Sequence, residues 1–225
     1  MEGGLTSTCI EGLIDSWGVK CVILDLDGTL VDTLEMHVEA FLRVAKEVGI
    51  EASRALIEQN MGRTPKDILS TIVPGIQGPR LALYAQRKED VLMGLIEDAH
   101  PLPGAVELLG RLKRSGLPMV LASSTTLRNV RKILQVAGLA CYIDRMVTAE
   151  DIVVGKPDPE IFIKAVAKGG SDPRHSLVIG DSVHDIAGAM GAGCLTIAVA
   201  SGKHDPEQLS ALKPNLIVSN LTLLC

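Results

Sequence analysis

The stretch Val22-Ile23-Leu24-Asp25-Leu26-Asp27-Gly28-Thr29-Leu30-Val31-Asp32-Thr33 decides how this chain folds. A short apolar run that stops at polar residues and glycine is typical of a buried strand in a parallel sheet. Ligands of open α/β sheets bind beyond the carboxyl ends of such strands. We therefore expect Asp25 and Asp27 to point into a cleft.

Two plainer interpretations of these residues stand beside that one. Asp27-Gly28 taken alone is typical of a tight turn, which explains the pair equally well. A calcium loop also begins with alternating acids and a glycine, but it requires a third oxygen ligand before the glycine and a glutamate near its end. Because Gly28 follows Asp27 directly, the sequence argues against calcium.

Three further segments carry polar residues at comparable places along the chain. They read PMVLASST from Pro118 to Thr125, GKPDPEIF from Gly155 to Phe162, and LVIGDSVHD from Leu177 to Asp185. Together with the first stretch, they resemble the four motifs of the haloacid dehalogenase superfamily of phosphohydrolases and phosphomutases. One such match would be weak, but four in order with sensible spacing are specific. The resemblance covers nearly everything from Cys21 onward.

The pattern of elements predicts an α/β fold with a Rossmann-like parallel sheet core. After residue 104 helices alternate with strands, which implies right-handed βαβ units, and residues 214–218 are expected to add a last strand. Residues 34–100 read as almost continuous helix without a strand signal, broken near Gly49, Gly62 and Pro74. The resemblance implies that this block is an inserted all-helical cap of the C1 type. We expect residues 21–33 and 101–225 to form the core.

Residues 1–20 form an N-terminal extension outside the resemblance. Ile10, Leu13, Ile14 and Trp17 are spaced as one face of a short helix, and Trp17 is expected to pack rather than to bind a ligand. The extension lacks the basic start and continuous apolar run of a signal peptide. We therefore expect a cytoplasmic protein without a membrane partner.

Composition narrows the class of function. The chain has 225 residues, of which 47% are hydrophobic and 22% are charged, which is ordinary for a globular protein. A net charge of −5 argues against a general nucleic-acid binder, and 2% aromatic residues make base stacking an unpromising binding mode. The five cysteines include no C-x-x-C pair, so no zinc or redox motif is predicted. A small-molecule partner fits better.

Phosphoryl transfer needs a nucleophile, a cation against the phosphoryl oxygens and a proton for the leaving group. We assign the nucleophile to Asp25, which would form an aspartyl-phosphate. Asp27, two residues on and on the same side of the strand, would act as acid and then as base. The resemblance implies Mg²⁺ held by the Asp25 side chain, the Asp27 backbone carbonyl and the Asp181 side chain. Asp185 would lie behind these ligands or hold Lys156 in place.

Lys156 would supply a fixed positive charge against the transferring phosphoryl group, and Ser123 would donate a hydrogen bond to one of its oxygens. Ser124 is expected to bind substrate beside it. Structural alternatives exist for each: a solvated loop lysine, and a helix cap or turn residue. Asp181 and Asp185 can likewise serve as an N-cap and a first-turn acid, and those roles can coexist with metal binding.

Candidate substrate-binding residues in the cap are Gly62, Arg63, His37 and Lys88. The run from His37 to Phe41 is similar to the H-x-x-A-W stretch of β-phosphoglucomutases, and Arg87-Lys88 to a basic pair that reaches their active site. Their closing motif typically carries Glu-Asp. This chain has Gly180-Asp181 with Asp185 four residues later, which is more like phosphoglycolate phosphatases.

The sequence therefore predicts a magnesium-dependent phosphatase that hydrolyses a small phosphorylated metabolite, such as phosphoglycolate or a sugar phosphate. The nearest alternative is a hexose-phosphate mutase of the β-phosphoglucomutase type. A non-catalytic phospho-acceptor, such as a receiver domain, has no need of Asp27 or of a cap of this length. A cap-bearing binding module is expected to have lost Asp25 or Asp181, and both are present.

Overall fold

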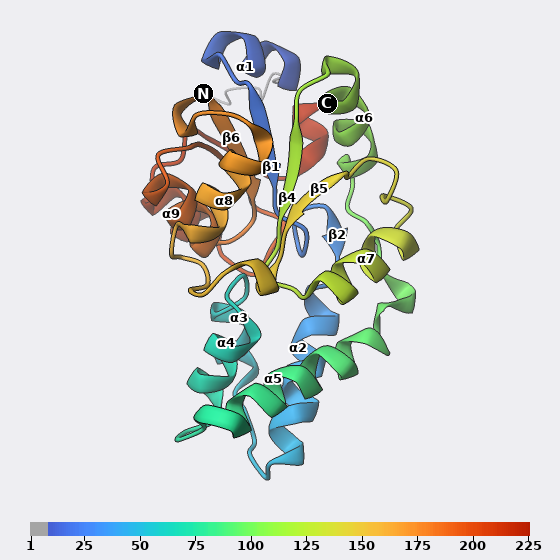
Figure 1. The fold of residues 1–225 in the computed structure, drawn as a ribbon, viewed down its shortest axis with the longest axis vertical. Coiled ribbons are helices and arrows are strands. Elements are labelled where there is room, and N and C mark those ends of the chain that lie inside the picture. Colours follow the sequence, from blue (N-terminus) through green and yellow to red (C-terminus); the bar gives the residue numbers. More distant parts are fainter. Residues whose placement is uncertain (1–8) are drawn as a thin grey trace, which may run out of the picture.

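The chain has an α/β, Rossmann-like fold in which six parallel strands form a central sheet (Figure 1). The computed structural model describes residues 9–225, and residues 1–8 lie outside the described part. The sheet order is β5-β4-β1-β6-β7-β8, so later strands are added on both sides of β1. The strands are β1 (Cys21–Leu24), β4 (Met119–Ala122), β5 (Arg145–Val147), β6 (Ser176–Gly180), β7 (Leu195–Val199) and β8 (Leu216–Val218).

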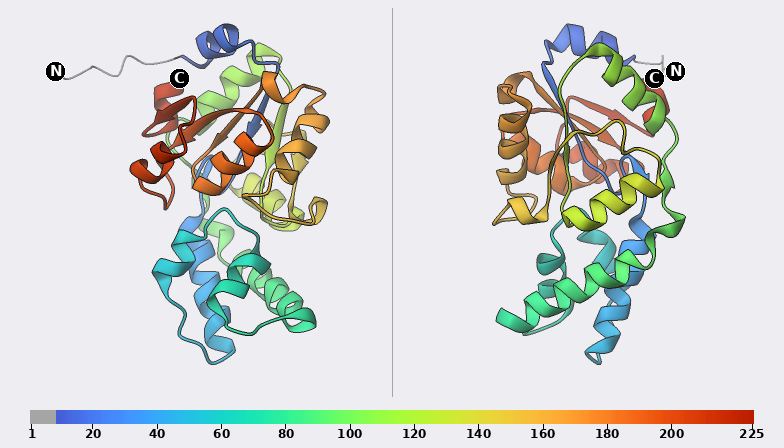
Figure 2. Two further views of the ribbon diagram at one scale, coloured as in Figure 1. Left: turned by 90° about the vertical axis from the view of Figure 1, so that its left-hand side faces the viewer. Right: turned by 45° about the vertical axis from the view of Figure 1, so that its right-hand side comes forward.

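The strands are apolar because both faces of the sheet are buried. Along β1, Val22 and Leu24 pack into one core while Cys21 and Ile23 pack into the other, as the alternation of side chains in a strand requires. Two sets of helices cover the two faces (Figure 2). One face lies under α6 (Ala105–Ser115) and α7 (Leu127–Val136), and the other under α8 (Glu160–Gly169) and α9 (Val183–Gly191). The short helix α10 (Pro206–Ala211) packs beside α9 and β8.

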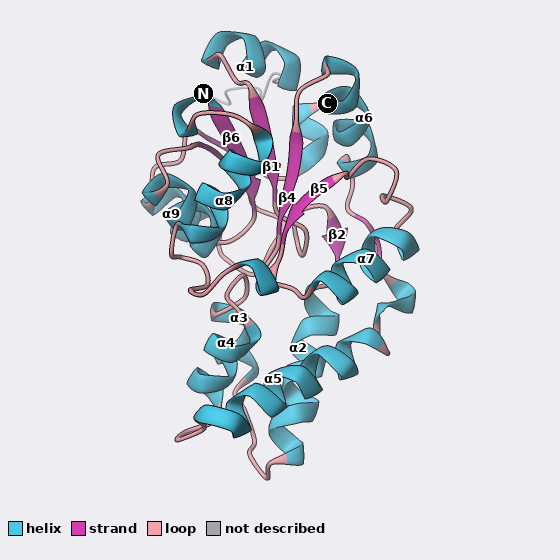
Figure 3. Ribbon diagram, in the orientation of Figure 1, coloured by secondary structure: helices cyan, strands magenta, loops and turns pink. Residues whose placement is uncertain are grey.

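Four helices between β1 and β4 form a separate hydrophobic cluster, and we call them the cap. They are α2 (Leu34–Glu47), α3 (Arg54–Gln59), α4 (Pro65–Ile72) and α5 (Gly78–Met93). Figure 3 shows this block as helix and loop below the sheet. Ser53 and Thr64 cap α3 and α4 by accepting hydrogen bonds from backbone N–H groups, which explains why the chain restarts as helix at these points. The division of the chain into domains stays a prediction.

The two segments that connect the sheet core to the cap form a short strand pair with each other. Val31 and Asp32 form β2, which is hydrogen-bonded antiparallel to β3 (His100–Pro101). The prediction of helix without strand up to His100 was therefore wrong at its last residue, after the 3₁₀ turn at Ile96–Asp98. A strand of two residues is too short to give a periodic pattern.

The predicted helix in the N-terminal extension is confirmed as α1 (Ile10–Trp17). Ile10 and Ile14 are buried against the core, and Trp17 packs against the same cluster as expected. Gly18 ends the helix in the left-handed conformation, where glycine meets no steric penalty. Figure 2 shows α1 at the end of the molecule away from the cap. None of the helices in residues 9–225 has the length and apolar character needed to cross a membrane.

Candidate active site

The candidate residues gather at the carboxyl ends of three neighbouring strands. Asp25 follows β1, Ser123 follows β4 and Asp181 follows β6, so the sheet brings together groups far apart in sequence. Gly28 turns the chain back behind Asp27 with a positive φ of 89°, and its N–H donates to the Val31 carbonyl. A β-carbon at Gly28 would lie 2.6 Å from an oxygen of Asp181, so glycine is required at this turn.

Lys156 is buried between two carboxylates. Its Nζ lies 2.6 Å from an oxygen of Asp25 and 2.6 Å from an oxygen of Asp185, and it donates to the Ala122 carbonyl at 2.9 Å. Burial opposes the charged form, but Asp185 and Asp25 outweigh it and hold the pKa of Lys156 above its ordinary value. Lys156 is therefore a fixed cation beside Asp25 rather than a solvated loop lysine, and Asp185 holds it there.

Three buried acids come close enough to share one cation. Oxygen atoms of Asp25, Asp181 and Asp185 all lie within 4.8 Å of one another. Burial, followed by repulsion from Asp185, raises the pKa of Asp25 to about 7, and burial with repulsion from Asp25 raises that of Asp181. Such crowding of like charges is what a divalent cation would relieve. The Thr29 hydroxyl, which sequence analysis missed, donates to Asp181 at 2.7 Å.

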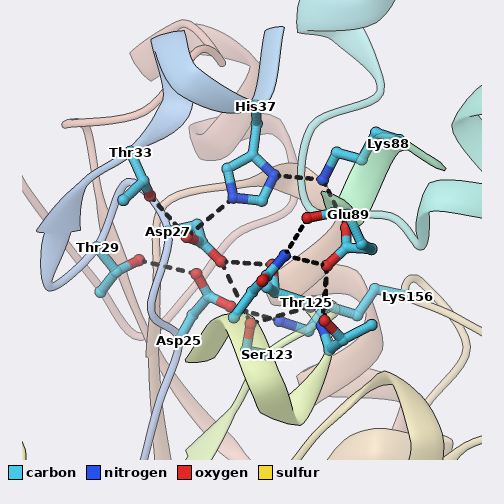
Figure 4. A network of polar contacts seen from close by, with 12 residues as sticks. Asp25, Asp27, Thr29, Thr33, His37, Lys88, Glu89, Ser123, Thr125 and Lys156 are labelled. Carbon is cyan, nitrogen blue, oxygen red and sulfur yellow. Dashed lines mark hydrogen bonds and ion pairs between the residues drawn. The ribbon is translucent and has the colours of Figure 1, made fainter. Parts of the chain in front are cut away.

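Asp27 is held by donors on both of its oxygens (Figure 4). One oxygen accepts from Thr33 at 2.6 Å and from His37 at 3.1 Å. The other accepts from Thr125 at 2.9 Å and from Ser123 at 3.3 Å. Burial alone would raise the pKa of Asp27, but His37 and these hydroxyls outweigh it and hold the pKa well below its ordinary range. The carboxylate is therefore ionised in this arrangement.

His37, from the first turn of α2, links Asp27 to a buried ion pair in the cap. Its Nδ1 lies 2.9 Å from Nζ of Lys88, and Lys88 lies 2.8 Å from an oxygen of Glu89. A lysine ammonium can only donate, so Nδ1 of His37 accepts and the ring proton resides on Nε2, facing Asp27. The order of donors therefore runs from Lys88 through His37 to Asp27, along contacts that Figure 4 draws as dashed lines.

Glu89 ties the cap to the sheet core, and sequence analysis missed it. Its side chain is 2% exposed, and it accepts from the Thr126 hydroxyl at 2.7 Å and from the Asn129 amide at 2.7 Å. Burial raises the pKa of Glu89, but Lys88 outweighs this and lowers it overall. An acid on a helix surface is usually solvated, so no local signal marked this one.

A four-residue segment after β7 touches the active site and the cap in turn. The Ser201 hydroxyl donates to the Gly28 carbonyl at 2.7 Å, and Gly202 lies directly against the Asp181 carboxylate. Lys203 forms ion pairs with Glu35 and Glu58 of the cap. His204 lies 3.2 Å from the carbonyl of Gln59, also in the cap. We call residues 201–204 the contact segment.

A small cavity separates the acids from the cap. Its volume is about 30 Å³, which leaves room for one or two water molecules. Asp25, Asp27, Ser124 and Thr125 line its floor, while the cap supplies apolar side chains together with Gly62 and Arg63. The apolar residues are Leu34, Phe41, Met61, Pro65 and Ile68.

The expected cap residues do not all face this cavity. Gly62, Arg63, His37 and Lys88 line it, and Ser124 donates to the Gly62 carbonyl at 2.7 Å. The expectation that Arg87 reaches the site together with Lys88 was wrong. Arg87 is exposed and forms a bidentate ion pair with Glu47 of α2. Successive residues of a helix point about 100° apart, so the pair cannot share one direction.

Comparisons with known proteins agree with this geometry. Residues 22–199 match the model of a family described as haloacid dehalogenase-like hydrolase. The chain is 30% identical over 206 residues to a probable phosphatase, IndB, of Dickeya dadantii, covering 89% of this chain and 90% of that protein. It is 31% identical over 196 residues to the β-phosphoglucomutase of Bacillus subtilis, covering 82% and 85%.

A solved structure of a hydrolase has a similar fold. A hydrolase from Pseudomonas syringae superimposes with a TM-score of 0.85 at 26% identity, over 91% of this chain and 95% of that one.

Proposed function

Because this chain belongs to the haloacid dehalogenase-like hydrolase family, we propose that it is a magnesium-dependent phosphatase acting on a small phosphorylated metabolite. One observation carries the proposal. Asp25 lies at a strand end in an ion pair with the buried Lys156, next to a second carboxylate, Asp27, that lines the same cavity. A nucleophile, a fixed cation and a proton acceptor are the parts that phosphoryl transfer requires.

The residues present fit a magnesium ion. Buried carboxylates within 4.8 Å of one another suit a hard divalent cation, and the raised pKa values of Asp25 and Asp181 indicate uncompensated negative charge. The side chains of Asp25 and Asp181, with the backbone carbonyl of Asp27, would hold the ion, and Asp185 would stay with Lys156. When bound, magnesium would neutralise the negative charge of the acids and of the phosphoryl oxygens.

In the first half-reaction, an oxygen of Asp25 forms a bond to phosphorus as the bond to the leaving-group oxygen breaks. Lys156 offsets the charge that Asp25 and the phosphoryl group bring together. We assign the proton that the leaving group takes up to Asp27. Asp27 is ionised in the structure without substrate, and it would take up this proton when the negatively charged substrate binds beside it. Ser123 and Ser124, which follow β4, would donate hydrogen bonds to phosphoryl oxygens. For this the Ser123 hydroxyl turns away from Asp27, and the Ser124 hydroxyl gives up its bond to the Gly62 carbonyl.

In the second half-reaction, Asp27 takes a proton from water, and the water oxygen attacks phosphorus. The bond to Asp25 breaks and phosphate leaves, so that Asp25 is again a carboxylate and Asp27 again carries a proton for the next leaving group. The hydrogen bonds on Asp27 support this step because they keep the carboxylate ionised and fixed in orientation. His37, oriented by Lys88, would hold one oxygen of Asp27. The other oxygen, which accepts from Thr125 and Ser123 in the structure without substrate, would take the proton.

A mutase is the second candidate, favoured by the β-phosphoglucomutase of Bacillus subtilis among the relatives and by the His37–Lys88 contact. The two activities differ in what receives the phosphoryl group, water or a second sugar phosphate. Phosphorus NMR of β-glucose 1-phosphate with enzyme, magnesium and a trace of bisphosphate distinguishes them. We expect free phosphate and no isomer. Clean conversion to glucose 6-phosphate without free phosphate would establish the mutase instead.

Substitution Asp25→Asn tests the covalent step directly. An amide cannot attack phosphorus, so phosphate release from p-nitrophenyl phosphate should fall to the background of a protein-free control. Asp144→Asn, at an acid outside the cavity, is the matched control and should keep wild-type turnover. Turnover of the Asp25→Asn protein comparable to wild type would rule out this residue as nucleophile.

A further inference from the structure

Arg63 carries a positive charge on the cavity wall that no carboxylate neutralises. Among residues 9–225, no acid lies within 4.0 Å of its guanidinium, whereas Lys88 is paired with Glu89 and Lys156 with Asp25 and Asp185. The guanidinium has one side-chain partner, because its Nη1 donates to the Asn60 amide oxygen at 2.8 Å. Its Nε is buried without any acceptor. A buried donor left without a partner is costly, so the guanidinium would be stabilised by an acceptor that a ligand places beside it.

The rest of the cap wall offers little else to a polar ligand. Both nitrogens of His37 are already engaged, by Asp27 and by Lys88. Lys88 is engaged by His37 and Glu89. The remaining cap side chains around the cavity are apolar, with Leu34, Phe41 and Met61 at most 7% exposed. A leaving group rich in hydroxyls would lose its hydrogen bonds to water here without replacement. A leaving group with one anionic end opposite Arg63 would find its partner.

The size of the cavity also restricts the leaving group. The cavity volume of about 30 Å³ cannot hold a phosphate ester, so the cap must withdraw from the sheet core to admit one. Withdrawal breaks contacts such as Ser124 with Gly62 and His204 with Gln59. A larger leaving group demands a wider withdrawal and sacrifices more of these contacts. The position of the cap therefore favours a compact leaving group.

We propose that Arg63 binds a carboxylate or phosphate on the leaving group, so that the preferred substrates are compact phosphomonoesters with a second anionic group rather than hexose phosphates. This inference rests on the proposed phosphatase activity and specifies its substrate class. The guanidinium suits the task because its planar donors match the two oxygens of a carboxylate. Arg63 acts on the leaving group and takes no part in the bonds that form or break at phosphorus.

The test compares two esters of the same shape. 2-Phosphoglycolate carries a carboxylate, and 2-phosphoglycolamide replaces it with a neutral amide. For the wild-type protein we expect kcat/KM to be about 10- to 100-fold higher for the carboxylate, the range of one charge-assisted hydrogen-bonded contact. In Arg63→Met, which keeps a long side chain without charge, the preference should fall to about 2-fold or less, because kcat/KM falls far more for the carboxylate than for the amide.

Arg80→Met is the matched control. Arg80 is an exposed cap arginine at the start of α5 that does not line the cavity, so its replacement should keep the wild-type preference. An unchanged preference in Arg63→Met, or no preference in the wild type, would overturn the inference. Equal turnover of both esters would do so while leaving the phosphatase proposal intact.

Binding measurements keep the inference testable without turnover. Calorimetric titration of the Asp25→Asn protein with both esters should show tighter binding of the carboxylate, and adding Arg63→Met should remove the difference. If the wild type hydrolyses no ester at all, the phosphatase proposal fails, and these binding constants still decide the role of Arg63. Equal dissociation constants for the two esters would refute it.

Discussion

Substitution Gly202→Ala should disable the active site without unfolding the protein. A β-carbon built on Gly202 would lie 1.9 Å from an oxygen of Asp181, whereas real β-carbons do not approach such atoms within 3.0 Å. The carboxylate or the contact segment must therefore move by about 1.1 Å, the difference between these distances. A misplacement of about 1 Å costs on the order of 100-fold in rate. We expect kcat/KM to fall by about that factor.

The assay is phosphate release across a magnesium titration, together with calorimetric titration of magnesium into the protein. Because Asp181 is a proposed ligand, both should show weaker binding of the ion. Gly12→Ala on α1 is the control, since a β-carbon there meets nothing within 4 Å. Alanine favours helix, so that variant should be as stable as wild type or slightly more so. Activity of Gly202→Ala within about 3-fold of wild type, with an unchanged magnesium dependence, would refute the steric argument.

The remaining predictions concern stability, metal and thiols. Glu89→Gln leaves the Lys88 ammonium buried without its carboxylate and should lower the free energy of unfolding in urea by about 3–5 kcal/mol, part of which Lys88→Met should restore in the double variant. A loss below about 1 kcal/mol would contradict this. Dialysis against a chelator should abolish phosphate release and added magnesium should restore it; full activity in metal-free buffer would exclude the acid cluster as a metal site. Burial raises the pKa of Cys21 to about 11 and of Cys194 to about 12 from an ordinary 9.0, so these thiols ionise in the unfolded chain before they do in the folded one. The free energy of unfolding should therefore fall as pH rises above about 9, by up to about 1.4 kcal/mol per pH unit for each thiol. This pH dependence should be weaker in the Cys21→Ala protein and unchanged in Cys141→Ala.

The parts of the site that sequence predicted are those that one strand and its following loop determine. Asp25, Asp27, Ser123 and Asp181 each end an apolar run, and a parallel sheet brings such ends to one edge whatever the length of chain between them. Lys156 was found by its motif. Its burial between two acids was not readable, because it depends on packing across the sheet.

The parts that sequence missed depend on contacts between distant segments. Glu89 is one acid among many on a helix until α5 packs on α7, where Thr126 and Asn129 surround it. Ser201-Gly202 is typical of a turn, but what requires glycine there is the Asp181 side chain, which lies 21 residues earlier in sequence. Local patterns predict local structure, and these residues owe their roles to the tertiary fold.

The ribbon formed by β2 and β3 also bears on how the chain tolerates recombination. The cap leaves the sheet core at Asp32 and returns at His100, and these two residues are paired across the ribbon. An inserted segment whose ends already meet imposes no separation on the strands to either side of it. The register of β1 against β4 is therefore independent of what lies between residues 32 and 100. A segment of different length and sequence can be spliced between these two positions. This would replace the cap over Asp25 and Asp27 while the residues at the strand ends keep their geometry.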